Sequence, residues 1–269
     1  MRVSQREKAH RLEELHSGAK ILVLPNVWDA MSARIVEAEG FPAAATSSSG
    51  CAAVFGYADG QRIPRGEMIY LVAKIVGAVD IPVTADVEAG YDDPVQTALD
   101  VVAAGAVGLN LEDRVNGQIL PIEEQKQRIR AVRSGCGFPL VINARTDIFL
   151  AAHGEESTRF ARAVERLNEY REAGADCLFC PGVKDAETIG RLVAAVRGPL
   201  NILAVPGTPS ISELRDLGVA RVSFGGGPSR VAMGAFRSFA RRIKEAGRFE
   251  NLSDVAIPAL ETQKLLKRS

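Results

Sequence analysis

The sequence has no excess of charge of either sign and no long apolar run, and both absences narrow the function. Its 269 residues carry 33 Lys and Arg against 33 Asp and Glu, so nothing favours binding to nucleic acid or to an acidic membrane surface. No apolar run is long enough to span a bilayer, and the polar start of the chain lacks the apolar core of a signal peptide. We therefore expect a cytoplasmic protein with no nucleic-acid or membrane partner.

Thiol and imidazole groups are also scarce. The four cysteines do not force a disulfide framework, and Cys177 and Cys180 form a C-x-x-C inside a stretch that is typical of a buried strand. A zinc site would need a second pair of ligands, whereas the three histidines are scattered along the chain. Neither a G-x-G-x-x-G after the first predicted strand nor a G-x-x-x-x-G-K-[ST] occurs, so nucleotide binding lacks its phosphate loop.

What the chain does have is a regular alternation of strand-like apolar runs and helical segments. The predicted strands lie at residues 21–25, 43–47, 81–86, 106–113, 139–147, 175–182, 201–207 and 220–227. Eight such units in about 250 residues predict a (β/α)₈ barrel, with a doubly wound open sheet as the alternative. We expect a single domain over residues 1–269, with a leader helix in 1–20 and a C-terminal helical extension in 248–269.

The stretch IPVTADVEAGY, Ile81 to Tyr91, is the most informative. A buried strand ends there in Asp86 and Glu88, and a spacing of two residues on an extended backbone puts both side chains on one face. Paired carboxylates repel each other unless a cation lies between them, and Mg²⁺ prefers such oxygen ligands. The alternative is a pair of solvated acids before a glycine turn.

Polar residues at the carboxyl ends of barrel strands meet at one mouth. The second predicted strand ends in a Ser-Ser-Ser-Gly loop that suits an anion, and the fourth ends in Glu112 and Asp113. The fifth ends in Arg145, which could hold a substrate carboxylate through paired N–H groups. Its alternative role is a salt bridge to Glu112 or Asp147. Glycines 225–227 after the eighth strand are a weaker sign of phosphate or carboxylate binding.

These segments, taken in order, resemble the isocitrate lyase and phosphoenolpyruvate mutase superfamily over nearly the whole chain. The resemblance rests on the Ser-Ser-Ser-Gly loop, Asp59-Gly60, TADVEAGY, GLNLED and INARTD. It implies a (β/α)₈ barrel whose last helix is exchanged between subunits of a homo-oligomer, usually a tetramer built as a dimer of dimers. It also implies Mg²⁺, with Mn²⁺ as an alternative, and a small 2-oxo acid ligand.

The resemblance also implies roles for individual residues. Asp86 corresponds to the direct metal ligand, and Glu88 and Glu112 to acids that hold the waters of the ion, although many members have Asp in place of Glu88. Arg145 corresponds to the substrate-binding arginine, and we expect catalytic roles for Asp59, Glu112 and Arg145. The remaining candidates for substrate binding are Trp28, Ser47, Ser48 (where many members have Gly) and, more weakly, Asn143.

The chain departs from the superfamily in the segments that distinguish the reactions of its members. Carbon–carbon lyases carry a K-[KR]-C-G-H loop after the fourth strand, whereas this chain has EDRVNGQILPIEEQ, with neither cysteine nor histidine. The glutamate of their F-P-E run is also missing, because Phe179-Cys180-Pro181 stands there. Cys180 takes the place of a histidine of the mutases, and Asn116 is the one residue available for their phosphoryl-binding loop.

These departures favour a Mg²⁺-dependent lyase that acts on a small 2-oxo dicarboxylic acid, in its simplest form by decarboxylation of an oxaloacetate-like substrate. The alternatives are a phosphoenolpyruvate or phosphonopyruvate mutase or hydrolase, a carbon–carbon lyase of the isocitrate or methylisocitrate type, and a non-catalytic 2-oxo acid binder. Residues 113–121 discriminate among them. A segment that can close with a proton donor favours carbon–carbon lyase chemistry, and one that cannot favours decarboxylation or binding.

Overall fold

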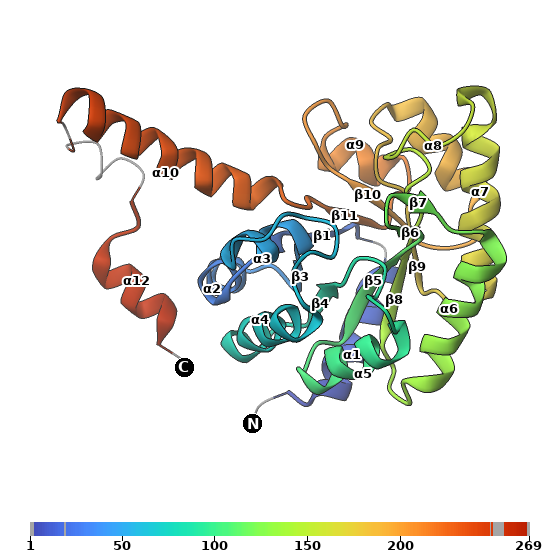
Figure 1. Ribbon diagram of the computed structural model, residues 1–269, viewed down its shortest axis with the longest axis horizontal. Helices are drawn as coiled ribbons and strands as arrows, with labels where there is room; N and C mark the ends of the chain where they lie inside the picture. The colour runs from blue at the N-terminus through green and yellow to red at the C-terminus, as the bar shows by residue number, and fades with distance from the viewer. Residues whose placement is uncertain (1–2, 19, 248, 250–255, 268–269) are drawn as a thin grey trace.

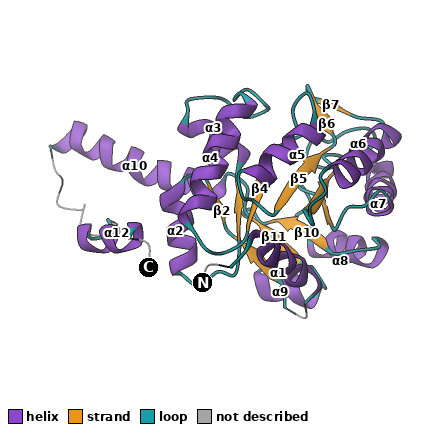
Figure 2. Cartoon of the chain, turned by 90° about the horizontal axis from the view of Figure 1, so that it is seen from below, coloured by secondary structure: helices purple, strands orange, loops and turns teal. Residues whose placement is uncertain are grey.

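The structure is a computed structural model that describes residues 3–18, 20–247, 249 and 256–267. Parallel strands form a ring at the centre and helices surround it (Figures 1 and 2). The strands of the ring are β1 (Leu22–Leu24), β2 (Asn26–Val27), β3 (Ala44–Thr46), β4 (Val83–Asp86), β5 (Gly108–Glu112), β8 (Val141–Arg145), β9 (Cys177–Phe179), β10 (Leu200–Leu203) and β11 (Arg221–Ser223).

The first strand of the barrel is split into β1 and β2 at Pro25. β1 pairs with β11 and β2 pairs with β3, so the two ends of the sheet are joined through a single residue. Proline has no N–H to donate to a neighbouring strand, although the Pro25 carbonyl still accepts a hydrogen bond from the Ala45 N–H at 3.2 Å. Counted as one strand, the two pieces complete the eight-stranded barrel, which confirms the (β/α)₈ prediction over the open sheet.

The helices fall where the alternation predicts them. Those around the barrel are α2 (Ala30–Ala38), α3 (Ser48–Val54), α4 (Arg65–Ala78), α5 (Pro94–Ala103), α6 (Ile122–Gly135), α7 (Glu156–Glu172), α8 (Ala186–Ala195) and α9 (Ile211–Asp216), and α10 (Gly227–Ala246) follows β11. One expectation was wrong: the Ser-Ser-Ser-Gly segment is the start of α3. Ser47 caps this helix by accepting the Gly50 N–H, as serine does readily at a helix start.

Helix α1 (Gln5–Ser17) lies within the predicted leader and covers the end of the barrel where the strands begin. Its Ala9 and Leu12 pack in a cluster with Leu22, the first residue of β1, and Val107, which precedes β5. His16, also buried, places Nε2 3.3 Å from the guanidinium of Arg221 in the barrel interior. The mouth at the opposite end is therefore the one that can admit a ligand.

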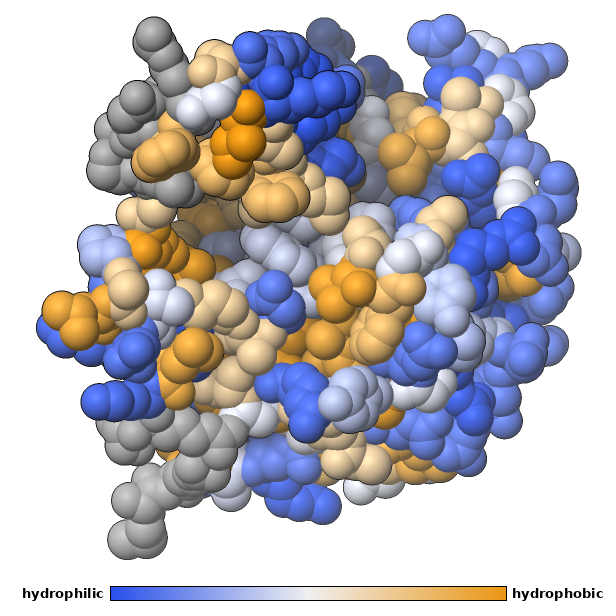
Figure 3. Space-filling view, turned by 60° about the vertical axis from the view of Figure 1, so that its left-hand side comes forward, coloured by the Kyte–Doolittle hydropathy of each residue, from blue (hydrophilic) through white to orange (hydrophobic). Residues whose placement is uncertain are grey.

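The C-terminal helices leave the barrel. Helix α10 projects away from it and α12 (Ala259–Leu266) turns back toward α2 (Figure 1), where Arg34 donates to the Lys267 carbonyl at 2.7 Å. Helix α12 lies within the predicted C-terminal extension at 248–269, of which residues 248, 250–255, 268 and 269 lie outside the described ones. Apolar side chains gather on this side of the molecule (Figure 3), and Val231 and Phe236 of α10 are 75% and 70% exposed. Exchange of this helix between subunits stays a prediction.

Among the described residues, the helices are too short or too polar to cross a membrane.

Candidate metal and 2-oxo acid site

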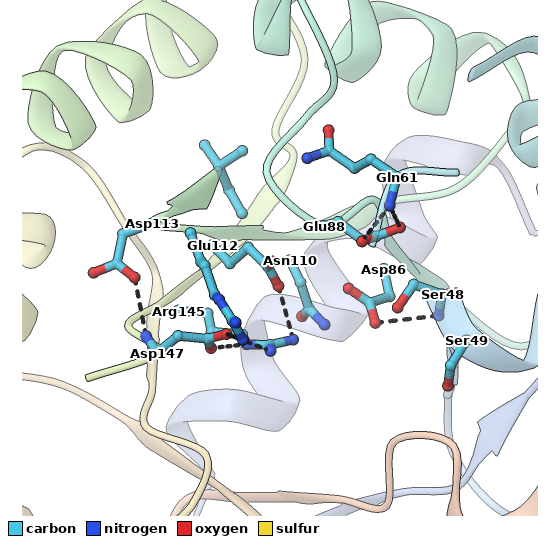
Figure 4. Close-up of polar contacts among 12 residues, drawn as sticks. Ser48, Ser49, Gln61, Asp86, Glu88, Asn110, Glu112, Asp113, Arg145 and Asp147 are labelled. Atoms are coloured by element: carbon cyan, nitrogen blue, oxygen red, sulfur yellow. Dashed lines mark hydrogen bonds and ion pairs between the residues drawn. The ribbon is translucent and has the colours of Figure 1, made fainter. Parts of the chain in front are cut away.

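Asp86 is the last residue of β4 and is 7% exposed at the mouth of the barrel. Its backbone N–H donates to Thr46 Oγ1 at 2.8 Å, and its Oδ2 accepts the Ser48 N–H at 3.2 Å (Figure 4). Its second oxygen, Oδ1, is buried and has no hydrogen-bond partner among the described residues. A buried carboxylate oxygen without a partner is costly, so this atom is positioned for a ligand.

Glu88 lies at the mouth in a backbone conformation that the strand pattern did not predict. β4 ends at Asp86, and Glu88 has a φ of 54°, so the two acids do not share the face of an extended strand. The Gln61 N–H instead donates to both Glu88 oxygens, at 2.8 and 2.9 Å. Burial raises the pKa of Glu88 to about 7, against the lowering effect of the Gln61 N–H and with a further increase from the nearby Asp86.

Arg145, the last residue of β8, lies between two carboxylates. Its Nη1 is 2.9 Å from Glu112 Oε2, while Nε and Nη2 donate to Asp147 at 2.6 and 3.0 Å (Figure 4). Both of its alternative salt bridges are therefore formed, and two of its five N–H groups stay free for a substrate. Burial and the neighbouring acids Asp147 and Asp86 raise the pKa of Glu112, whereas Arg145 opposes this increase.

Asp113 does not face the mouth, contrary to prediction. It is fully buried and points to the other side of β5. There it accepts hydrogen bonds from Thr146 Oγ1 at 2.7 Å, the Asp147 N–H at 2.9 Å, Tyr170 Oη at 2.8 Å and Arg166 Nη1 at 3.1 Å. Adjacent residues of a strand point to opposite faces, and Glu112 takes the inner one.

A cavity of about 370 Å³ lies between these groups. Five of the predicted site residues line it: Ser48, Asp59, Glu88, Glu112 and Arg145. The lining also contains residues for which the sequence analysis found no functional role, or only a structural one: Gly60, Gln61, Arg62, Arg114, Gly117, Asp147 and Leu150. Desolvation and the neighbouring Asp86 raise the pKa of Asp59.

Four predicted substrate contacts are not part of this lining: Asp86, described above, and Trp28, Ser47 and Asn143. Trp28 instead packs against Gly50 and donates its backbone N–H to Ser32 Oγ at 3.0 Å. Ser47 is the buried cap of α3. Asn143 is buried in the barrel interior, where its Nδ2 donates to Asn110 Oδ1 at 2.8 Å.

The glycine run after β11 does not present free N–H groups at its start. The N–H groups of Phe224 and Gly225 donate to Asn26 Oδ1 at 2.7 and 2.9 Å. A side-chain amide of β2 thus occupies the position that the sequence suggested for a phosphate or carboxylate.

The segment after β5 is a tight β-hairpin of β6 (Arg114–Val115) and β7 (Gln118–Ile119). Asn116 and Gly117 form its turn with φ values of 49° and 81°, as expected for the Asn-Gly turns that favour short hairpins. The Leu120 N–H donates to the Asp113 carbonyl at 2.8 Å and closes the hairpin at its base. The Asn-Gly pair is readable in the sequence and could have predicted this short, closed form.

The residues at the mouth fit a divalent cation. Four carboxylates and three arginines line the cavity, and adding Asp86 gives five negative against three positive formal charges, an excess of two. No group of three or more His, Cys, Asp and Glu side chains within the described part of the chain is arranged to bind a metal directly. Mg²⁺ typically keeps several waters and binds through one or two carboxylates, so Asp86 Oδ1 would be the direct ligand, and Glu88 and Glu112 would bind its waters.

Comparison with known proteins agrees with the barrel. The family model for phosphoenolpyruvate phosphomutase matches residues 12–244. A 2-methylisocitrate lyase of Halalkalibacterium halodurans is 30% identical over 279 residues, covering 98% of this chain and 89% of the relative. A crystal structure from Burkholderia cenocepacia J2315, described as a lyase/mutase, superimposes with a TM-score of 0.90 at 33% identity, covering 97% of this chain and 96% of the other.

Two more distant structures share the fold. Oxaloacetate acetylhydrolase in complex with 3,3-difluorooxalacetate has a TM-score of 0.85 at 24% identity, with 96% of this chain and 93% of the other covered. Phosphonopyruvate hydrolase in complex with oxalate and Mg²⁺ has a TM-score of 0.86 at 23% identity, with 96% and 94% covered.

The chain belongs to the phosphoenolpyruvate phosphomutase family, within the isocitrate lyase and phosphoenolpyruvate mutase superfamily. This confirms the resemblance predicted from the sequence, and the relatives include a 2-methylisocitrate lyase and a phosphoenolpyruvate phosphomutase.

Proposed function

We propose that this protein is a Mg²⁺-dependent lyase that decarboxylates a small 2-oxo dicarboxylic acid such as oxaloacetate. The observation that carries the proposal is the short hairpin next to the acid-lined cavity. Residues 113–121 form a closed turn without cysteine or histidine, so this segment supplies no thiol or imidazole acid to a cleaved carbon. Decarboxylation does not need such an acid, because solvent can protonate the product.

The side chains of the mouth have separate tasks in this reaction. The free N–H groups of Arg145 bind the C1 carboxylate of the substrate, while Asp147 and Glu112 fix the guanidinium. Asp86 Oδ1, aimed by the Thr46 and Ser48 contacts, is the ligand of the cation. When bound, Mg²⁺ supplies the electron sink, because it stabilises the negative charge that develops on the 2-oxo oxygen. Mn²⁺ suits the same oxygen ligands.

The bond that breaks joins C3 to the C4 carboxylate. Its electron pair moves toward C2 and the 2-oxo oxygen, CO₂ leaves, and a water molecule then donates a proton to C3 to give pyruvate. Two structures of the same fold support a ligand of this kind: oxaloacetate acetylhydrolase is in complex with 3,3-difluorooxalacetate, and phosphonopyruvate hydrolase is in complex with oxalate and Mg²⁺.

The test is release of pyruvate from oxaloacetate by the purified protein with Mg²⁺, compared with Mg²⁺ alone. We expect a rate above this background that Asp86→Ala abolishes. Asp80→Ala is the matched control, because Asp80 is an exposed acid before the start of β4, at the other end of the strand. Pyruvate release at the background rate by the wild type, or equal rates for wild type and Asp86→Ala, would refute decarboxylation at this site.

A second candidate is phosphorus–carbon chemistry, because Asn116 lines the cavity from the hairpin turn. Incubation with phosphonopyruvate and observation by ³¹P NMR tests it: a new phosphoenolpyruvate or inorganic phosphate signal would favour this reading, and an unchanged spectrum would remove it. Cleavage of 2-methylisocitrate in the same screen would favour a carbon–carbon lyase. Calorimetric binding of 2-oxoglutarate without turnover of any substrate would favour a non-catalytic binder.

We also propose that the protein is a homo-oligomer, a dimer of dimers in which α10 packs on a partner subunit. Support comes from the apolar residues that α10 exposes away from its own barrel.

A further inference from the structure

We infer that Arg114 binds the second anionic group of the substrate and so restricts the site to 2-oxo acids that carry two negative groups. The inference rests on the proposed function, because it takes the 2-oxo acid to lie between Asp86 and Arg145. It adds a residue that selects the substrate class.

Arg114 has a fixed position beside the metal acids. It begins β6, two residues after Glu112, and lines the same cavity. The preceding residue, Asp113, is held by four hydrogen-bond donors, and the hairpin is closed at Leu120. Because the hairpin is short and has a two-residue turn, Arg114 can contact the substrate without the closure of a long loop.

Of the two guanidinium groups near Asp147, those of Arg145 and Arg114, the one of Arg114 has fewer hydrogen-bond partners. Its Nη1 is 4.0 Å from Asp147 Oδ2, beyond hydrogen-bond distance, and its side chain is 40% exposed. Asp147 already accepts two hydrogen bonds from Arg145. Arg145 is occupied on three of its N–H groups, whereas among the described residues the only ionic partner of Arg114 is this distant carboxylate. Arg114 therefore has N–H groups available for an anion in the cavity.

The chemistry of this subsite suits a carboxylate or a phosphonate on C3, since a guanidinium binds both through paired hydrogen bonds. In decarboxylation, the carboxylate loses its charge as CO₂ forms. Arg114 would then stabilise the bound substrate at least as much as the transition state, which strengthens binding without raising kcat. Its loss should raise KM and leave kcat unchanged or higher.

Calorimetric titration of the Mg²⁺-loaded protein with a set of probes measures how much the second anionic group contributes to the binding affinity. The probes are 3,3-difluorooxaloacetate, phosphonopyruvate and 2-oxobutyrate, the last of which keeps the 2-oxo acid and lacks the second anionic group. We expect Arg114→Gln to weaken the two dianionic probes by about 10- to 100-fold, the range for a hydrogen bond to a charged group, and to leave 2-oxobutyrate unchanged. Arg114→Lys should restore part of the loss. Whichever dianion loses more identifies the group, carboxylate or phosphonate, that the subsite fits.

Two variants serve as comparisons. Arg11→Gln removes an exposed arginine of α1, far from the mouth, and should leave all affinities unchanged. Arg62→Gln removes the other arginine that lines the cavity apart from Arg145. Unchanged dianion affinity in Arg114→Gln, or an equal loss for 2-oxobutyrate, would overturn the role of Arg114, as would a loss confined to Arg62→Gln. If the wild type binds none of the probes, the proposed function fails and this inference fails with it.

Discussion

Replacement of Asp113 by asparagine tests how the mouth of the barrel is held in place. The side chain is fully buried, and its Oδ2 is 3.1 Å from Arg166 Nη1, which is itself only 7% exposed. Asparagine keeps the shape and can still accept two hydrogen bonds, but it leaves the Arg166 cation buried without a counter-charge. Removing one partner of a buried ion pair costs about 3–5 kcal/mol.

This loss can be converted into a melting temperature. An unfolding entropy of about 2.1 cal/mol/K per residue gives about 0.56 kcal/mol/K for 269 residues, so Tm should fall by about 5–9 °C. The assay is urea unfolding at a fixed protein concentration, with thermal unfolding as a second readout, because association would make stability concentration-dependent. KM should rise as well, since the Asp113 carboxylate accepts the N–H of Asp147, and the carboxylate of Asp147 in turn holds the Arg145 guanidinium.

The matched control is Asp176→Asn. Asp176 also pairs with an arginine and accepts a β8 N–H, from Ile142, but it is 30% exposed and lies at the far end of that strand. We expect a smaller loss, about 1 kcal/mol for a solvent-exposed pair, and no change in KM. Adding Arg166→Met to Asp113→Asn should recover part of the stability, because the orphaned cation is then gone. A loss below 1 kcal/mol for Asp113→Asn, or strictly additive effects in the double variant, would refute the reasoning.

Three further predictions concern other parts of the fold. Gly90 has a φ of 83°, and a Cβ there would lie 2.8 Å from the Pro94 Cβ, whereas Gly56 has a φ of 81° and open space around it. In urea unfolding, Gly90→Ala should therefore lower the free energy of unfolding by about 1–3 kcal/mol more than Gly56→Ala. Equal losses for the two variants would contradict this. Burial, followed by the charge of a neighbouring arginine, lowers the pKa of His16 from its usual 6.5 to about 4, so below pH 6.5 only the unfolded chain takes up this proton. Stability should therefore fall by about 2–3 kcal/mol more for wild type than for His16→Gln between pH 7 and pH 4.5, and parallel pH profiles would refute it. Phe236→Glu, on the exposed face of α10, should lower the molar mass measured by light scattering; an unchanged oligomer would place the interface elsewhere.

The sequence predicted the barrel because the apolar runs, helix caps and glycine punctuation recur at one spacing, and this pattern does not depend on detailed packing. The positions of Asp86, Glu112 and Arg145 at the carboxyl ends of their strands follow from the same pattern, while their roles stay predictions. It failed where the backbone leaves regular geometry. The left-handed conformation of Glu88 depends on the Gln61 N–H, which comes from a loop 27 residues away.

Other outcomes depended on competition between partners, which a sequence does not display. The N–H groups after β11 were plausible anion donors until Asn26, 198 residues earlier in the chain, was seen to bind them. Asp113 was one of two consecutive acids, and only the strand register and the buried Arg166 decide which of them faces inward. A strand-end residue is therefore predictable in position, while its orientation and its partner require the three-dimensional structure.

The short hairpin after β5 bears on both the proposed reaction and the proposed choice of substrate. The hairpin turns at Asn116-Gly117 and contains neither cysteine nor histidine, and the same short turn fixes Arg114 beside Glu112. A cation at this position favours tight binding of a doubly charged 2-oxo acid, and a product enolate that solvent can protonate needs no acid from the chain. If both inferences hold, substituting the hairpin should change substrate choice before it changes the metal-dependent step, because Asp86 and its supporting contacts from Thr46 and Ser48 belong to different elements of the barrel.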